Sequence, residues 1–480
     1  MSLSASLNTA LAGLGLSSRR AEVIASNVAN ADTPGYARRR LLAGGVGLGP
    51  IGGASVGRDV SPQLQALRRD AQSGAANASV GQSFTARVDQ LLGDPGDPGS
   101  LQDMLNRFDA ALTAASTDPA SDTRLAGLSQ ASQGIVDKVN SVAQGILSQR
   151  QQADTEIGRT VENLNTDLQS IEKLNTDIQR VKAHGQNPST LMDQRQVLVD
   201  RVSSQIPVRQ LTRDNDRVAL VSTGGIMLLD GPAAELTFTP RAPITAEMVV
   251  GTHLSGLQIN GKPVNVTGAH GQVSGGRLSA LFSVRDESAP TAMARLDAFA
   301  LELATRFQDP AVDPSLPAGD AGLFTDRGAA ADASNVTGLS LRMSLNPDAR
   351  PESAATHWKF RDGFGATIAG PTTSGAQLQR FSDAISSVQT SADTTVSSAP
   401  SDLTGFAASL RSLASSDRIT AEDTYTRKQA SADTLAAMRD GGKVDIDAEM
   451  RRLIEVEQAY AANARLIQAV DQMMNRLSEL

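Results

Sequence analysis

The sequence predicts a mainly α-helical fold with a β-rich central insertion, in which helices from the two ends of the chain pair as a coiled coil. Apolar residues recur at alternating three- and four-residue spacings near both ends and over residues 122–183, which is typical of helices with one packing face. Aromatic residues make up only 3% of the 480-residue chain. The cores are therefore expected to be aliphatic, as in helix bundles and coiled coils.

The first helix is expected to end near residue 31. Its apolar seam contains five large side chains: Leu3, Leu7, Leu14, Ile24 and Val28. Pro34 disfavours helical geometry at Thr33, and Gly35 tolerates the positive φ of a turn.

The last helix is expected to start after the break at Gly441-Gly442, with Asp445 as its N-cap. One line of residues spaced a heptad apart is wholly apolar: Ile446, Leu453, Tyr460, Ile467 and Met474. The alternate seam positions are Glu449, Val456, Asn463, Val470 and Leu477. Periodicity alone leaves open whether the two end helices pair with each other or with other copies of the chain.

Four helices are expected between these ends, before the chain changes character at Pro207. A helical pattern runs to about residue 92, and the Gly- and Pro-rich stretch 93–99 ends it in a loop. Helices follow over 101–116, 122–183 and 190–204. The longest of them could reach roughly 90 Å, a length that is typical of bundles and fibres.

The middle of the chain predicts hairpins, and the last third returns to helices. Residues 217–222 and 226–229 predict one hairpin, and 257–259 and 264–266 predict another across an Asn-Gly turn. A helix is expected to start at Pro290. Later candidates are strands near 339–343 and 357–360, and helices over 376–393, 402–415 and 418–439.

These elements predict four segments, two of which are assembled from separate stretches of the chain. Residues 1–40 plus 441–480 form a terminal coiled-coil domain. Residues 41–206, 281–308 and 376–440 form a helical rod domain. Residues 207–280 form a β-rich insertion, and 309–375 form a loop- and β-rich outer segment.

Composition and motifs argue against a catalytic or ligand-binding site. The chain has no Cys, its four His are isolated, and its net charge of −8 argues against nucleic acid as a partner. The string Gly47-Leu48-Gly49-Pro50-Ile51-Gly52 fits the dinucleotide fingerprint only as letters, because Pro50 lies inside the turn and an extended segment, 54–60, follows where the fingerprint requires a helix. The basic runs 38–40 and 68–69 are interpreted as solvated faces. We expect no catalytic, metal or cofactor site, no membrane insertion and no cleaved signal peptide.

Both ends of the chain resemble one known family. Residues 25–36 resemble the Asn-x-x-Asn-x-x-Thr-x-Gly-Tyr signature of bacterial flagellar axial proteins, and residues 447–480 resemble the second signature of that family. Residues 191–200 and 275–281 resemble segments of its hook-associated members. Asp32 and Arg39 depart from the Asn and Gln that are common at their positions, so subunit contacts are expected to differ there.

The resemblance implies a structural subunit that forms the junction ring between hook and filament by polymerising through its terminal helices. It implies self-assembly, contacts with hook protein and with the second hook-associated protein on the filament side, and a cytoplasmic export chaperone at the C-terminal helices. It also implies secretion through the flagellar export channel to the extracellular flagellum. The expected assembly interface comprises Leu3, Leu7, Leu14, Ile24, Asn27, Val28, Pro34, Gly35, Tyr36, Ile446, Leu453, Val456, Tyr460, Asn463, Ile467, Val470, Met474 and Leu477.

Two alternative functions remain open at this point. The chain could be a hook or rod subunit, which a β-dominated 100–205 region would favour. It could also be an enzyme domain displayed on a flagellar axial scaffold, which a deep pocket with perturbed carboxylates in the β-rich middle would favour.

Overall fold

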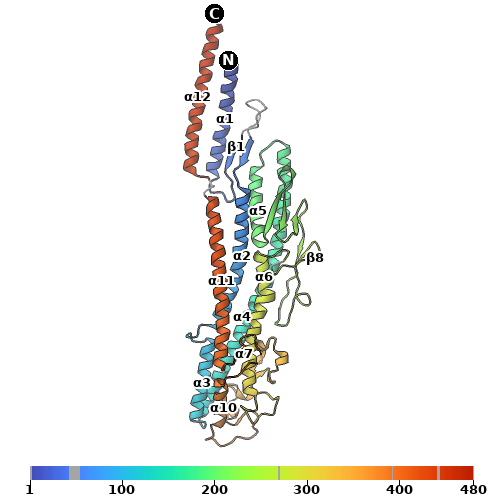
Figure 1. The fold of residues 1–480 in the computed structure, drawn as a ribbon, viewed down its shortest axis with the longest axis vertical. Helices are drawn as coiled ribbons and strands as arrows, with labels where there is room; N and C mark the ends of the chain where they lie inside the picture. Colours follow the sequence, from blue (N-terminus) through green and yellow to red (C-terminus); the bar gives the residue numbers. More distant parts are fainter. Residues whose placement is uncertain (1–2, 43–54, 269–270, 392, 441–443, 479–480) are drawn as a thin grey trace.

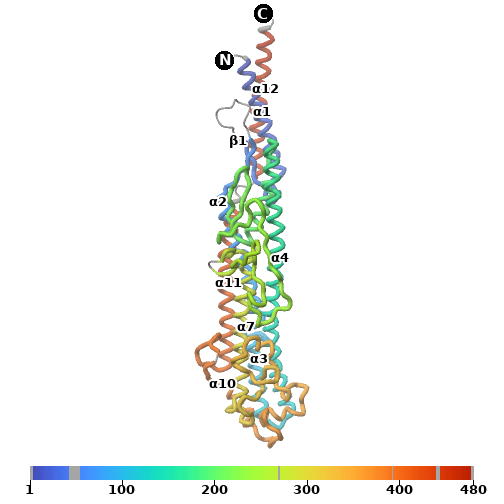
Figure 2. Tube along the Cα trace, turned by 90° about the vertical axis from the view of Figure 1, so that its right-hand side faces the viewer, coloured from blue at the N-terminus to red at the C-terminus, as the bar shows by residue number. Residues whose placement is uncertain are grey.

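The chain is an elongated helical rod with both ends of the described chain at one tip (Figure 1). A computed structural model describes residues 3–42, 55–268, 271–391, 393–440 and 444–478. Gly47–Gly52 lie outside these described residues. The loop-rich stretch that follows residue 309 lies at the opposite tip, beyond the helices of the rod (Figure 2). Among the described residues, no helix has both the length and the apolar character that a membrane span requires.

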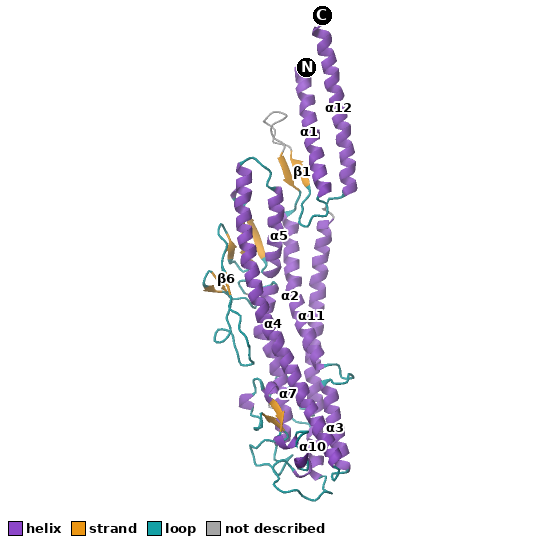
Figure 3. Cartoon of the chain, turned by 180° about the vertical axis from the view of Figure 1, so that it is seen from behind, coloured by secondary structure: helices purple, strands orange, loops and turns teal. Residues whose placement is uncertain are grey.

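The two end helices lie side by side beyond the rod, as the sequence predicted (Figure 3). They are α1 (Leu3–Ala29) and α12 (Ile446–Ser478). The chain leaves α1 through a turn in which the Thr33 N–H donates to the Asn30 carbonyl. Gly35 has φ +82°, and a Cβ there would collide with Val197. The turn therefore requires glycine for its backbone angle and for its close approach to the next layer.

Long helices packed along one another form the rod. They are α2 (Pro62–Leu92), α4 (Asp122–Ala183), α7 (Ala289–Gln308) and α11 (Leu403–Asp440), supported by the shorter α3 (Leu101–Thr117), α5 (Ser189–Gln205), α6 (Arg277–Ser283) and α10 (Ala376–Ser386). Serine caps start three of these helices, because the Ser61, Ser100 and Ser121 hydroxyls accept from backbone N–H groups three residues on.

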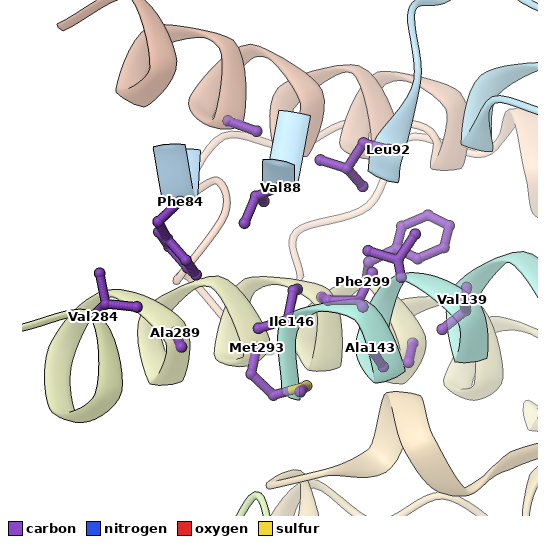
Figure 4. Packing of buried hydrophobic residues seen from close by; sticks show 14 of the residues in the cluster. Phe84, Val88, Leu92, Val139, Ala143, Ile146, Val284, Ala289, Met293 and Phe299 are labelled. Carbon is purple, nitrogen blue, oxygen red and sulfur yellow. The ribbon is translucent and has the colours of Figure 1, made fainter. Parts of the chain in front are cut away.

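The core of the rod is aliphatic along most of its length and aromatic near the loop-rich tip. Figure 4 shows the aliphatic part, where Val88 and Leu92 of α2 face Ile146 of α4 and Met293 of α7. Near the tip, the Phe307 ring lies 5.6 Å from Phe108 and 5.3 Å from Phe324, measured between ring centroids. The few phenylalanines of the chain are thus concentrated where the long helices meet the loops.

Short antiparallel sheets lie against the helices. Their strands are β1 (Arg39–Leu42) with β2 (Ser55–Arg58), β3 (Val208–Thr212) with β4 (Val218–Ser222) and β5 (Met227–Leu229), β6 (Leu236–Thr237) with β7 (Gln258–Ile259) and β8 (Lys262–Pro263), and β9 (Phe324–Asp326) with β10 (Met343–Leu345). Both predicted hairpins are present. Asn260 and Gly261 have φ values of 51° and 72°, as a type I′ turn requires.

Several predicted elements were wrong in type or extent. Residues 339–342 form a helical turn, α8 (Leu339–Arg342), before β10, and the predicted strand at 357–360 is replaced by α9 (Lys359–Asp362). Periodicity does not separate a short buried helix from a strand in runs of this length. The two helices expected over 402–415 and 418–439 are one helix, α11, and α10 ends at Ser386 rather than 393.

Phe108→Ala tests the tip core. We expect a loss of about 3–5 kcal/mol in the free energy of unfolding, because this fully buried ring contacts two other aromatic rings. Urea denaturation followed by circular dichroism measures the change. The matched control is Leu67→Ala on the exposed side of α2, which should stay within about 0.5 kcal/mol of the wild type. Equal losses in the two variants would contradict the packing described here.

Candidate assembly interface at the terminal helices

The helices α1 and α12 run antiparallel in a single register. The Asn27 amide donates to the Glu449 carboxylate near the rod, at 3.2 Å. Fourteen residues earlier on α1 and fourteen later on α12, a Cβ added to Gly13 would lie 2.8 Å from Asn463 Nδ2. Because the shifts are equal and opposite, both contacts belong to one continuous interface.

Small and polar residues dominate the contacting faces. On α1 the buried heptad line is Ala10, Ser17 and Ile24. On α12 the line that includes Glu449, Val456 and Val470 is buried. Small side chains on α1 let the helices approach closely, so α12 can place a carboxylate and an amide in the interface.

The all-apolar line of α12 is not the line that packs against α1, which corrects the pairing expected from the sequence. Ile446, Tyr460 and Met474 are 45%, 45% and 52% exposed. Leu453 and Ile467 are half-buried at the edge of the contact. The expected pairing ranked positions by apolarity, whereas the observed interface is centred on the alternate line because its polar groups find partners.

The remaining predicted interface residues differ in how far they are buried. Leu7, Leu14, Val28, Gly35, Tyr36 and Asn463 are half-buried; Ile24, Asn27, Val456 and Val470 are buried; Pro34 is exposed. The side chains of Leu3 and Leu477 lie outside the part of the chain that the structure describes.

Exposed apolar side chains lie on both flanks of the helix pair. Leu466 and Met473 follow positions of the buried line by three residues, whereas Tyr460 and Met474 follow them by four. Offsets of three and four residues fall on opposite sides of a heptad seam. On α1, the exposed Leu11 follows Ala10 and the exposed Leu16 precedes Ser17, again on opposite sides. The pair therefore presents two different apolar flanks to its surroundings.

Asn27 is a hydrogen-bond centre at the base of the helix pair. Its side chain is 1% exposed, and its Oδ1 accepts from the Tyr36 hydroxyl at 2.9 Å and from the Arg39 backbone N–H at 2.8 Å. Its Nδ2 donates to the Arg39 carbonyl at 3.0 Å and to Glu449. One amide thereby joins α1, β1 and α12, and its hydrogen-bonding capacity is fully used.

Glu449 is held as a buried carboxylate. Burial by itself raises its pKa, but hydrogen bonds from Asn27 and Arg38 and the charges of Arg38 and Arg452 outweigh that effect and lower the pKa. The Arg38 Nε lies 2.8 Å from Glu449 Oε1. Glu449 and Arg38 are absent from the residues proposed from the sequence. A charged residue at a seam position of an apolar heptad was the available signal, because such a group must find a buried partner.

The basic runs are mostly not solvated faces, contrary to the interpretation from the sequence; Arg40 is exposed, but Arg39, Arg68 and Arg69 are buried. Arg39 is buried against Asp193 of α5 at 2.5 Å, and Arg58 lies 2.7 Å from the other oxygen of the same carboxylate. Arg68 and Arg69 are buried against Asp200, one heptad further along α5. Basic runs of this kind can serve as ties between elements, and one sequence cannot show which acids they meet.

The described residues contain no cluster of three or more His, Asp or Glu side chains arranged to hold a metal ion. Grooves on the described surface include one of about 790 Å³ along α2, α7 and α11, and one of about 730 Å³ between the end of α1 and α5. The first is lined mainly by apolar and hydroxyl side chains such as Phe84, Val284 and Thr420.

Asn27→Ala tests the hydrogen-bond centre. We expect a loss of about 1–3 kcal/mol in stability, because buried donors and acceptors of Tyr36, Arg39 and Glu449 lose their partner. Thermal unfolding by circular dichroism measures the loss. Asn30→Ala is the matched control from the same turn, since Asn30 donates only to the local Ser26 carbonyl and accepts only a long bond from Thr33. If the two variants unfold alike, Asn27 does not hold the base together.

The Glu449 carboxylate predicts loosening of the helix pair in acid. A lowered folded-state pKa contributes stability above the unfolded pKa of about 4.3, and this stability is lost as the pH falls through the folded value. Helicity measured from pH 7 to pH 3 should therefore drop below about pH 4.3. In Glu449→Gln this component should be missing, with lower stability at pH 7. An unchanged acid transition in the variant would assign it to other groups.

Comparison with known proteins finds matches to flagellar protein families in three parts of the chain. Residues 7–36 match the flagella basal body rod protein family, 85–310 match the helical domain of flagellar hook-associated protein FlgK, and 441–480 match the C-terminal family of flagellar basal body rod FlgEFG proteins. The helical match covers α3, α4 and α5, and it contains both internal segments that resembled hook-associated proteins.

Relatives and a solved structure carry related names. Flagellar hook-associated protein 1 of Salmonella typhimurium is 26% identical over 315 residues, which cover 62% of this chain and 56% of that protein. The protein of the same name from Bacillus subtilis is 24% identical over 246 residues, 47% of each chain. The flagellar hook junction protein FlgK from Burkholderia pseudomallei has a TM-score of 0.45 at 19% identity, covering 55% of this chain and 46% of that one. The chain thus spans just over half the length of the Salmonella relative. By its matches at both ends and along the helical rod, the chain is similar to the flagellar hook-associated protein 1 family of axial proteins.

Proposed function

We propose that the protein is a structural subunit of the bacterial flagellum that forms the junction ring between hook and filament. The observation that carries this proposal is the pair of unlike apolar flanks on the α1–α12 helix pair. Tyr460 and Met474 on one side and Leu466 and Met473 on the other remain exposed after the two helices have packed. Burying such faces requires further helices.

Two unlike faces favour a ring or a helical array over an isolated dimer. A two-fold dimer buries the same patch on both partners and leaves the second flank in water. Contacts that join one flank to the opposite flank of the next copy bury both, and they propagate around a ring or along a helix. Part of the expected interface fits this role in two classes: Ile24, Asn27, Val456 and Val470 are buried, and Ile446, Tyr460 and Met474 are exposed. The buried line builds the pair, and the exposed flanks join the pairs.

The rest of the function follows from the family. Hook protein and a second hook-associated protein are the proposed neighbours at the two ends of the ring, and an export chaperone covers the C-terminal helices beforehand. Secretion runs through the flagellar export channel to the extracellular flagellum. In this proposal the stretches 1–40 plus 441–480 are the tube-forming domain, and the rod, the β-rich insertion and the outer segment surround it. The protein acts by assembly and not as an enzyme.

The helical middle supports a junction subunit over a hook or rod subunit. Residues 101–205 are occupied by α3, α4 and α5, where a β-dominated region was the feature expected of the alternative. The apolar groove along α2, α7 and α11 lies mainly between rod helices, although Gly268, Ser274 and Gly275 of the β-rich stretch also line it. No specific observation favours a displayed enzyme.

Leu466→Glu combined with Met473→Glu tests the proposal. Two carboxylates on one flank should abolish incorporation into flagella, because an unpartnered buried charge costs on the order of 3–5 kcal/mol. Motility of cells that carry only the variant, together with its recovery in purified flagella, measures the effect.

The matched control for this variant is Gln468→Glu combined with Gln472→Glu. It adds the same charge to exposed positions away from the seam and should assemble normally. Circular dichroism of each free chain checks that both are folded. Normal motility of the flank variant would rule out this flank as an assembly surface.

A further inference from the structure

Helix α5 carries two aspartates that make the same kind of contact with different parts of the molecule. Asp193 bridges Arg39 and Arg58, and Asp200 bridges Arg68 and Arg69. The two aspartates are seven residues apart and therefore face the same side of α5. The arginines of Asp200 belong to α2, a helix of the rod. Those of Asp193 belong to β1 and β2, which pack with α1 instead.

A continuous polar path connects Asp193 to the terminal helices. Arg39 exchanges both of its backbone hydrogen bonds with the Asn27 side chain, and Asn27 in turn contacts Glu449 of α12. On the other side, α5 is anchored in the rod by the buried Val199 and Val202. Asp193 is therefore the buried charge that links the rod to the terminal helix pair.

Arg39 is held in one geometry by three contacts. Its guanidinium lies 4.7 Å from the centre of the Tyr36 ring, its Nη1 donates to the Ala37 carbonyl at 3.0 Å, and its Nη2 contacts Asp193. Next to it, Gly35 approaches Val197 so closely that no Cβ fits between them. The turn after α1 and the β1–β2 hairpin thus meet α5 through a tight contact at Val197 and a fixed arginine at Asp193, one turn of α5 apart.

Positive charge accumulates around this carboxylate. Burial, together with the nearby charge of Arg58, lowers the pKa of Arg195 to about 10, although Asp216 raises it. Arg58 thus lies near a further arginine, Arg195, in addition to sharing Asp193 with Arg39. Without the carboxylate, Arg39 and Arg58 would lose the negative charge that they share, and their mutual repulsion favours separation of the hairpin from α5.

We propose that Asp193 is a positioning residue that fixes the orientation of the terminal helix pair on the rod. The chain passes between these two parts from β2 to α2 and from α11 to α12, and the side-chain contacts of Asp193 add an angular restraint to these connections. The inference rests on the proposed function for its consequence, since subunits in a ring must present their terminal pairs at one common angle. The orientation itself is a property of the free chain, and it can be measured without assembly.

The absence of Cys allows a direct measurement of the orientation. Spin labels on Gln458→Cys in α12 and Thr176→Cys in α4 report the distance between the terminal pair and the rod, and both positions are exposed. A second pair, Gln149→Cys and Thr176→Cys, lies entirely on α4 and reports whether the rod is intact. In the unsubstituted background, we expect one narrow distance distribution from each pair.

Asp193→Asn should broaden the distribution between α12 and α4 and shift its centre, while the distribution within α4 stays narrow. Asp200→Asn is the matched control: it removes the same charge from the same helix, but it should leave both distributions unchanged even if it lowers the melting temperature. Asp193→Glu keeps the charge and should restore most of the wild-type distribution.

Two results would overturn the proposal: a narrow, unshifted distribution in Asp193→Asn, or equal broadening in Asp200→Asn. If Asp193→Asn also broadens the distance distribution between positions 149 and 176 within α4, the variant Arg58→Gln provides the deciding measurement. This variant leaves Arg39 and Asp193 as a neutral pair. The proposal requires that the distance distribution between α12 and α4 broadens in this variant, and an unchanged distribution would reject the proposal. Failure of the flank variants to block assembly would leave these distances unaffected, so the two proposals are tested separately.

Discussion

The buried carboxylate of Glu449 is the constraint on which the terminal part of the molecule depends. A charge at a seam position must be paired, and here Asn27 and Arg38 pair it from two different elements. This requirement sets the register of α12 against α1, because a shift of one residue would take the carboxylate away from the amide. It also selects which line of α12 faces inward, and thereby leaves Ile446, Tyr460 and Met474 outside.

The two ends of the helix pair are therefore built for different purposes. Near the rod, polar contacts tie α1, α12, the hairpin and α5 into one unit, and the side chains that make them are largely buried. Further out, the contact depends on small residues such as Ala10 and Gly13 and on Val470, and the flanking leucines and methionines lie in water. Isolated helices are marginally stable in water, so the outer half gains most from neighbours that cover those flanks.

The long periodic elements could be predicted from the sequence, and the choice between alternatives of similar pattern could not. The 62-residue helix α4 and the Asn260-Gly261 hairpin follow from periodicity and turn chemistry alone. The inward line of α12 does not, because the polar Glu449 line becomes favourable only when Asn27 and Arg38 are placed beside it. Similarly, Arg39 and Arg68 resemble solvated residues until α5 places Asp193 and Asp200 against them. The misassigned strand near residue 360 has the same cause, since a segment of four residues takes its conformation from its surroundings.

Amide hydrogen exchange of the outer half of the helix pair, compared between the free chain and assembled flagella, tests the central claim most directly. The account predicts rapid exchange in residues 3–20 and 457–474 of the free chain, slower exchange at the base around Asn27 and Glu449, and the slowest exchange in residues 122–204. On assembly, the outer half should become protected while the rod changes little. Strong protection of residues 457–474 already in the free chain, with no gain on assembly, would contradict the claim that neighbouring copies complete this helix pair.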